Sequence, residues 1–182
     1  GMTTLVVRPG ETSRILVTLT APMNAQSGDP APVLTPVASS QISGSAATVD
    51  SFSGIRVKML HNLILRAIDT PVAVIPGEGN IAVFEIENDG NGPDHAVISI
   101  DGLPSTWSYI IEVEGTVLSG PISLSPSYEG LDIKQFQLIF TPPGGEDANF
   151  NVDITVTINS MEGDDLNVSD NSHVFGVMTE RV

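Results

Sequence analysis

The chain has 182 residues, a formal net charge of −15 and no cysteine, and 41% of its residues are hydrophobic. Because 22 acidic residues stand against only 7 basic ones, the chain repels phosphate backbones and anionic lipid, so we expect no nucleic acid partner. The absence of cysteine excludes disulfide bonds, thiolate zinc sites and cysteine nucleophiles. No apolar run reaches the ~20 residues of a membrane span, so we expect no membrane insertion in this segment.

Short runs that alternate between apolar and polar residues and are rich in Val, Ile and Thr follow one another along the chain. They occupy residues 15–20, 33–37, 81–87, 136–140 and 152–158. Successive side chains of a strand point to opposite faces, so Ile81 and Val83 should lie opposite Phe84 and Ile86. Turn-forming residues separate the runs, at 8–10, 76–79, 88–93, 142–145 and 162–165. The pattern predicts an all-β fold, an antiparallel β-sandwich.

One stretch, residues 58–68, has a spacing of apolar residues that also fits a helix. Its flanks lack a helix cap, and strand patterns surround it on both sides. We therefore predict two strands, or a strand and a linker, at this point of the chain.

An internal repeat divides the sequence. Residues 15–22 match residues 136–143 in pattern, residues 33–37 parallel residues 152–156, and residues 49–57 parallel residues 169–177. From this repeat we predict the back half of a sandwich domain at residues 1–60, a linker or first strand at residues 61–68, and a complete domain at residues 69–182. We also expect the segment to belong to a longer tandem array.

Three short motifs resemble a known family. They are Pro76-Gly77-Glu78-Gly79 followed by Ile86-Glu87-Asn88-Asp89-Gly90-Asn91-Gly92, then Gly102-Leu103-Pro104-Ser105-Thr106-Trp107, then Ser123-Leu124-Ser125-Pro126 with Thr141-Pro142-Pro143. In this pattern, residues 72–158 and the partial copy at 5–40 resemble the Ig-like domain associated with NPCBM modules and α-galactosidases, which is close to the cell-adhesion-related (CARDB) domains. The chain departs from the family at residues 127–129, where Gly-Glu is usual. The resemblance implies an Ig-like sandwich that serves as a spacer or adhesion module.

No catalytic arrangement is visible in the sequence. His61, His95 and His173 are isolated, without a second ligand at metal spacing, and the motifs of phosphate loops, zinc proteases and serine hydrolases are missing. Asp94 and His95 are adjacent, so on a strand their side chains would point to opposite faces. We expect a chain that is not an enzyme.

Two acidic turns are candidates for a calcium site, the one cofactor that the composition suggests. Their residues are Asp164, Asp165, Asn167 and Asp170 in the first turn, and Asp89, Asn91 and Asp94 in the second. Crowded carboxylate and amide oxygens suit calcium, although the first turn lacks the glycine and the final glutamate of an EF-hand. The alternative, which we favour, is a solvated turn in which Asn and Asp stabilise the backbone.

Trp107 is the one tryptophan, and with Tyr109 and Tyr128 it suggests a sugar-stacking platform as a ligand contact. The alternative is that Trp107 closes one end of the sandwich core. We favour core packing, because only 5% of the chain is aromatic.

Together these features favour a non-catalytic spacer and adhesion module of a larger cell-surface or secreted protein, whose partners are other Ig-like repeats or surface proteins. The first alternative is an accessory, glycan-binding module of a secreted glycoside hydrolase, and the second is a cytosolic subunit of an assembly. The apolar face of Ile15, Val17 and Leu19 would lie bare in a half-domain, and bare faces and open strand edges tend to find a partner. We therefore expect a homodimer formed through residues 3–59.

Overall fold

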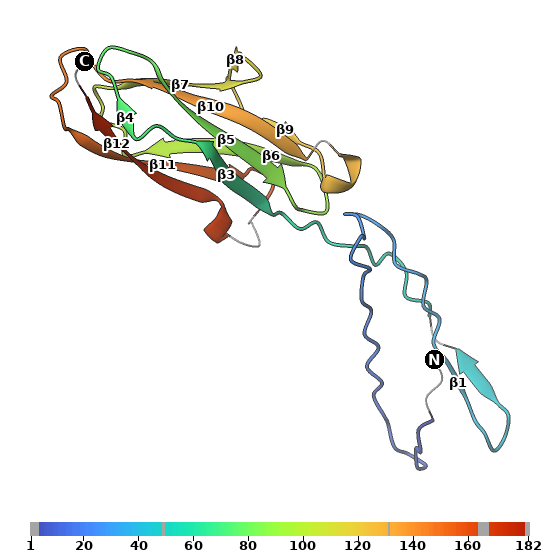
Figure 1. Ribbon diagram of the computed structural model, residues 1–182. Coiled ribbons are helices and arrows are strands. Elements are labelled where there is room, and N and C mark those ends of the chain that lie inside the picture. Colours follow the sequence, from blue (N-terminus) through green and yellow to red (C-terminus); the bar gives the residue numbers. More distant parts are fainter. Residues whose placement is uncertain (1–3, 49, 131, 164–167, 181–182) are drawn as a thin grey trace.

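The computed structural model describes residues 4–48, 50–130, 132–163 and 168–180, and most of these form two packed β-sheets (Figure 1). The first sheet has the order β3-β5-β10-β7-β8, with bounds β3 Leu63–Asp69, β5 Asn80–Asn88, β10 Ile133–Thr141, β7 Ser108–Val113 and β8 Thr116–Val117. The second has the order β4-β12-β11-β6-β9, with bounds β4 Ala73–Val74, β12 Ser172–Thr179, β11 Asn151–Ser160, β6 Asp94–Asp101 and β9 Ile122–Leu124. The predicted fold class, an all-β Ig-like sandwich, is confirmed.

Neighbouring strands pair antiparallel, except that β4 pairs with β12 in parallel. Two single 3₁₀ turns, η1 at Ser127–Glu129 and η2 at Val168–Asp170, are the helical elements of the described residues. Neither has the length or the apolar character that a bilayer-crossing helix requires.

The core lies between the two sheets and follows the predicted alternation. On β5, Phe84 and Ile86 are buried while Ile81 is exposed, so they lie on opposite faces, as the sequence predicts. The ring of Phe84 stacks on Phe136 of β10 with the centroids 5.2 Å apart. The remaining fully buried core residues on the two central strands are Leu138, Phe140, Ile154, Val156 and Ile158. Burying such side chains contributes about 1.5–3 kcal/mol each, which makes the centre of the sandwich its most stable part.

Residues 4–57, called the arm here, leave one end of the sandwich (Figure 1). Within the arm, β1 (Val37–Ser39) pairs with β2 (Ala46–Thr48), and single bridges join Pro30 to Arg56 and Leu34 to Phe52. Residues 29–57 therefore form a loose hairpin. The strand expected at residues 15–20 is not formed, and the one expected at residues 33–37 is reduced to the bridge at Leu34 and to Val37, where β1 begins. Neighbouring strands that would hydrogen-bond to residues 15–20 are missing among the described residues, which explains the difference.

Candidate functional site

The arm meets the sandwich at a built contact, called the junction here, between residues 58–62 and the loop 88–94 that connects β5 to β6. Asn91 joins the two sides with both ends of its side-chain amide. The Leu60 backbone N–H donates to Asn91 Oδ1 over 2.7 Å, and Asn91 Nδ2 donates to the Lys58 carbonyl over 3.0 Å. The backbone N–H of Asn91 also donates to the Leu60 carbonyl. Asn91 thus holds residues 58–60 as a neighbouring strand would.

Two further residues give the loop the shape that this contact needs. Asn88 is fully buried; its Nδ2 donates to the Gly92 carbonyl over 2.9 Å, and its Oδ1 accepts from the Gly90 backbone N–H over 3.0 Å. A Cβ on Gly90 would lie 2.5 Å from the Leu60 carbonyl oxygen, closer than real Cβ atoms approach. Glycine at position 90 is therefore required by the contact with residues 58–62.

His61, Asp94 and Ser160 form a hydrogen-bonded cluster at the junction. Asp94 is 1% exposed; its Oδ2 lies 2.9 Å from His61 Nδ1, and its Oδ1 accepts from the Ser160 hydroxyl over 2.7 Å. The Ser160 hydroxyl also lies 3.3 Å from the same nitrogen, His61 Nδ1. A catalytic triad needs the acid and the serine on opposite ring nitrogens, so that one nitrogen orients the ring and the other takes the proton. This cluster lacks that geometry and ties three segments of the chain together instead.

The second histidine of this region, His95, confirms the prediction that the side chains of Asp94 and His95 point to opposite faces of a strand. His95 follows Asp94 on β6, and while Asp94 points into the protein, the His95 ring is half exposed and its Nδ1 lies 2.8 Å from Glu162 Oε1. The third histidine, His173 on β12, packs against Phe84 and Phe175 with ring centroids 6.1 and 6.5 Å apart. Each histidine thus contacts other side chains of the protein.

The candidate calcium residues of loop 88–94 contact three different parts of the junction. Asp89 Oδ2 accepts from Asn62 Nδ2 over 3.0 Å, Asn91 binds Lys58 and Leu60, and Asp94 binds His61 and Ser160. Within the described ranges, no group of three or more His, Asp or Glu side chains is placed to hold a metal ion. Asp164, Asp165, Asn167 and the side chain of Asp170 lie outside the described residues. Calcium binding by either turn stays a prediction.

Trp107 lies inside the sandwich end. Its side chain is 5% exposed, its ring is nearly parallel to Phe140 at 6.1 Å between centroids, and its Nε1–H donates to Glu146 Oε2 over 2.8 Å. A sugar platform needs an open ring face, and this indole offers almost none. The structure thus favours core packing over the ligand contact considered for Trp107. Tyr109 on β7 is half exposed.

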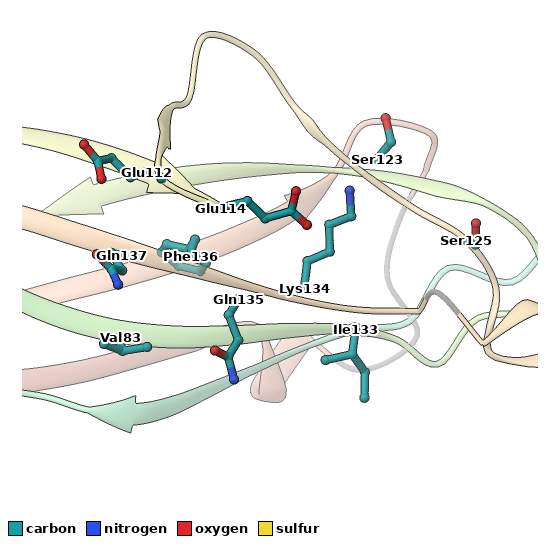
Figure 2. Close-up of a pocket in the computed structure, with 11 residues that line it drawn as sticks. Val83, Glu112, Glu114, Ser123, Ser125, Ile133, Lys134, Gln135, Phe136 and Gln137 are labelled. Carbon is teal, nitrogen blue, oxygen red and sulfur yellow. The ribbon is translucent and has the colours of Figure 1, made fainter.

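A groove of about 700 Å³, lined by both polar and apolar residues, runs between the β7–β8 hairpin, β9 and β10 (Figure 2). Lys134 points between Glu114 and Ser123, and Gln135 and Gln137 lie along the same strand (Figure 2). Phe136 is the aromatic residue of the lining and is buried in the core. The groove can hydrogen-bond a polar ligand, and sequence reasoning missed it because its residues come from four separate stretches of the chain.

No protein-family model matches this chain, and no curated protein matches its sequence. Among solved structures, it is similar to the CARDB domain of a Pyrococcus furiosus protein in complex with di-metal ions, at 16% identity over 67% of this chain and 89% of that chain, with a TM-score of 0.40.

Two other solved structures are similar over a comparable part of the chain. One is the SrpA adhesin of Streptococcus sanguinis, at 17% identity over 66% of this chain and 58% of that chain, with a TM-score of 0.38. The other is AvmM, which catalyses macrocyclization in alchivemycin A biosynthesis, at 10% identity over 70% of this chain and 93% of that chain, with a TM-score of 0.45. The order and pairing of the strands make the chain an Ig-like β-sandwich in fold, and the similarity to these solved structures concerns the fold alone.

Proposed function

We propose that the chain is a non-catalytic spacer and adhesion module of a larger cell-surface or secreted protein, within an array of Ig-like repeats. The junction is the observation that supports this proposal. Asn91, Asp89 and Asp94 each bind a different part of residues 58–62, and Gly90 lets the two backbones approach closely. A flexible linker needs no such contacts. A spacer does need them, because they keep successive parts of the chain in one direction.

The proposal includes an absence of turnover. Ser160, His61 and Asp94 combine the residue types of a catalytic triad, but Ser160 and Asp94 both contact the same ring nitrogen of His61. An extracellular or cell-surface location and partners among other Ig-like repeats or surface proteins belong to the same proposal. The net charge of −15 supports it, because mutual repulsion keeps a protein in solution and discourages nonspecific association.

Trypsin cleavage after Lys58 tests the junction, because Asn91 Nδ2 binds the carbonyl group that trypsin must attack. Asn91→Ala removes two side-chain hydrogen bonds worth about 0.5–1.5 kcal/mol each, so local opening and cleavage should increase about tenfold or more. Asn159→Ala, on the exposed face of β11, is the matched control and should cleave at the original rate. Unchanged cleavage of Asn91→Ala would remove the support for a fixed spacer.

A second candidate function, an accessory carbohydrate-binding module of a secreted glycoside hydrolase, has the groove beside Lys134 in its favour. Sugar hydroxyl groups pair well with hydroxyl, ammonium and carboxylate groups, and Ser123, Lys134 and Glu114 supply such groups there (Figure 2). A glycan array tests this candidate. Binding that Lys134→Ala abolishes and Lys58→Ala leaves intact would favour the carbohydrate module, and an array without any bound glycan would exclude it.

A further inference from the structure

The arm presents a row of apolar side chains whose counterparts in the sandwich are buried. Ile15, Val17 and Leu19 are 67%, 63% and 44% exposed, and in a strand these three side chains would share one face. The repeat aligns them with residues 136, 138 and 140 of β10, which are 1%, 0% and 0% exposed. The same pattern is therefore covered in one copy and open in the other.

The structure of β10 shows what kind of neighbour such a strand takes. Phe136 is opposite Phe84 on one edge and opposite Val113 on the other, and both neighbouring strands are antiparallel to β10. Residues 15–19 have no ladder partner among the described residues. An antiparallel strand of alternating apolar residues fits this edge, since its backbone groups would be paired and its side chains would meet the row.

The distribution of charge indicates which strand would pair with residues 15–19. Residues 4–57 contain three arginines and three acidic residues, whereas residues 61–182 contain 19 acidic and only 3 basic residues. Two sandwiches repel each other, while two arms have no net charge and meet without that cost. An arm on a second copy is thus the part of the molecule best suited to contact the open row.

We propose that two copies of the chain associate through residues 15–19, paired antiparallel about a two-fold axis at Val17. In this register Val17 faces Val17 of the second copy, and Ile15 faces Leu19 of the second copy. All six apolar side chains then share one face, with Leu16 and Thr18 on the other. A two-stranded ribbon alone is marginally stable, and the two hairpins, with Val33 and Val37 exposed, supply the covering layer. This inference deepens the proposed adhesion role, and its test leaves residues 58–62 unchanged, so the two can fail separately.

Sedimentation velocity on the full chain tests the association. We expect a dimer whose dissociation constant rises at least about 100-fold in Val17→Asp, because two carboxylates would face each other within an apolar layer. Leu16→Asp adds the same charge one residue away, on the opposite face, and should change the constant less than about threefold. A chain that is monomeric at roughly 100 μM, or a dimer that Val17→Asp leaves intact, overturns the proposal.

Cysteine crosslinking tests the register, and it is clean because the chain has no cysteine of its own. Directly opposite residues of an antiparallel pair have Cα atoms about 4.5–5.5 Å apart, within the range of a disulfide bond. Val17→Cys should therefore convert to a covalent dimer under mild oxidation, at least about tenfold faster than Leu16→Cys. Equal rates for the two variants overturn the pairing, and the absence of a covalent dimer in both would overturn it in favour of an arm covered by its own sandwich or by another repeat.

Discussion

The arm and the sandwich contain the same apolar pattern and reach different structures. In the sandwich, residues 136–140 lie between β5 and β7 and form the centre of the core. In the arm, residues 15–19 have the same alternation, yet they form no strand and stay exposed. The comparison shows that alternation determines which side chains share a face, while neighbouring strands determine whether that face is buried. Four predictions sharpen this comparison.

The largest effect is expected at Trp107, which covers Phe140 at the end of the sandwich and has no counterpart beside Leu19 in the arm. Trp107→Ala should lower the free energy of unfolding by about 3–5 kcal/mol, the usual cost of removing a large buried aromatic side chain. Urea denaturation followed by circular dichroism measures this loss. Trp107→Phe keeps a ring and removes the hydrogen bond to Glu146, so it should cost less. A loss below about 1 kcal/mol for Trp107→Ala would show that the indole is not part of the core.

A matched pair of substitutions to alanine tests the two copies of the pattern directly. Leu138→Ala should cost about 2–5 kcal/mol because it opens a cavity in a closed core. Val17→Ala, at the aligned position of the arm, should change the unfolding of the sandwich by less than about 0.5 kcal/mol. Both are measured by urea denaturation of dilute protein, where association is weak. Equal losses would mean that the two rows are buried alike, which would remove the contrast.

The junction links the two regions, and Gly90 is its tightest point. Gly90→Ala places a methyl group against the Leu60 carbonyl and should cost about 1–3 kcal/mol, the range for an inserted group in a packed site. Gly145→Ala is the control, because a Cβ there meets nothing within 4 Å. Hydrogen exchange of the amides of residues 60 and 91, which both donate hydrogen bonds across the junction, is the measurement, with faster exchange expected in Gly90→Ala alone. Exchange that stays slow in this variant would show that the loop adapts without glycine.

The smallest effect is expected on the sandwich surface, at Arg66 of β3. Arg66 contacts Glu87, and its Nη1 lies 3.6 Å from Glu85 Oε1. The hydrogen bond to Glu87 raises the pKa of the guanidinium, which is charged in any case. Because the pair is open to water, Arg66→Gln should cost less than about 1 kcal/mol, and salt should reduce the cost. A larger loss that persists in high salt would place Arg66 among the groups that hold β3 in the sheet.

Features of the fold that depend on neighbouring residues in the sequence were predictable, and features that depend on contacts between distant segments were not. The alternation of β5, β10 and β11 depends on consecutive residues, so the division of their side chains between two faces was predicted correctly. The strand at residues 15–20 was predicted wrongly, because a strand also needs a neighbour that lies elsewhere in the chain. The stretch 58–68 was predicted as two strands or as a strand and a linker, and it divides at Leu63, where β3 begins.

The junction could not be predicted, because its contacts join loops that are far apart in the sequence. His61 meets Asp94 and Ser160 only after β5, β6 and β11 have assembled. The run Asn88-Asp89-Gly90-Asn91-Gly92 was the available signal, since it holds more turn-forming residues than a strand connection needs. It was assigned to turn chemistry or to calcium, whereas Asn91 and Gly90 serve a contact with residues 58–62.

The parallel pairing of β4 with β12 has a mechanical consequence. The chain enters the sandwich at the junction, and β12 ends at Thr179 at the opposite end of the molecule (Figure 1). Tension applied between these ends runs along the strands, across hydrogen bonds that lie perpendicular to the pull. Met178 and Thr179 pair with Ala73 and Val74, so the last residues of β12 are loaded in shear against β4. Bonds loaded in this way share the force and rupture together, whereas a strand peeled from its end loses them one after another.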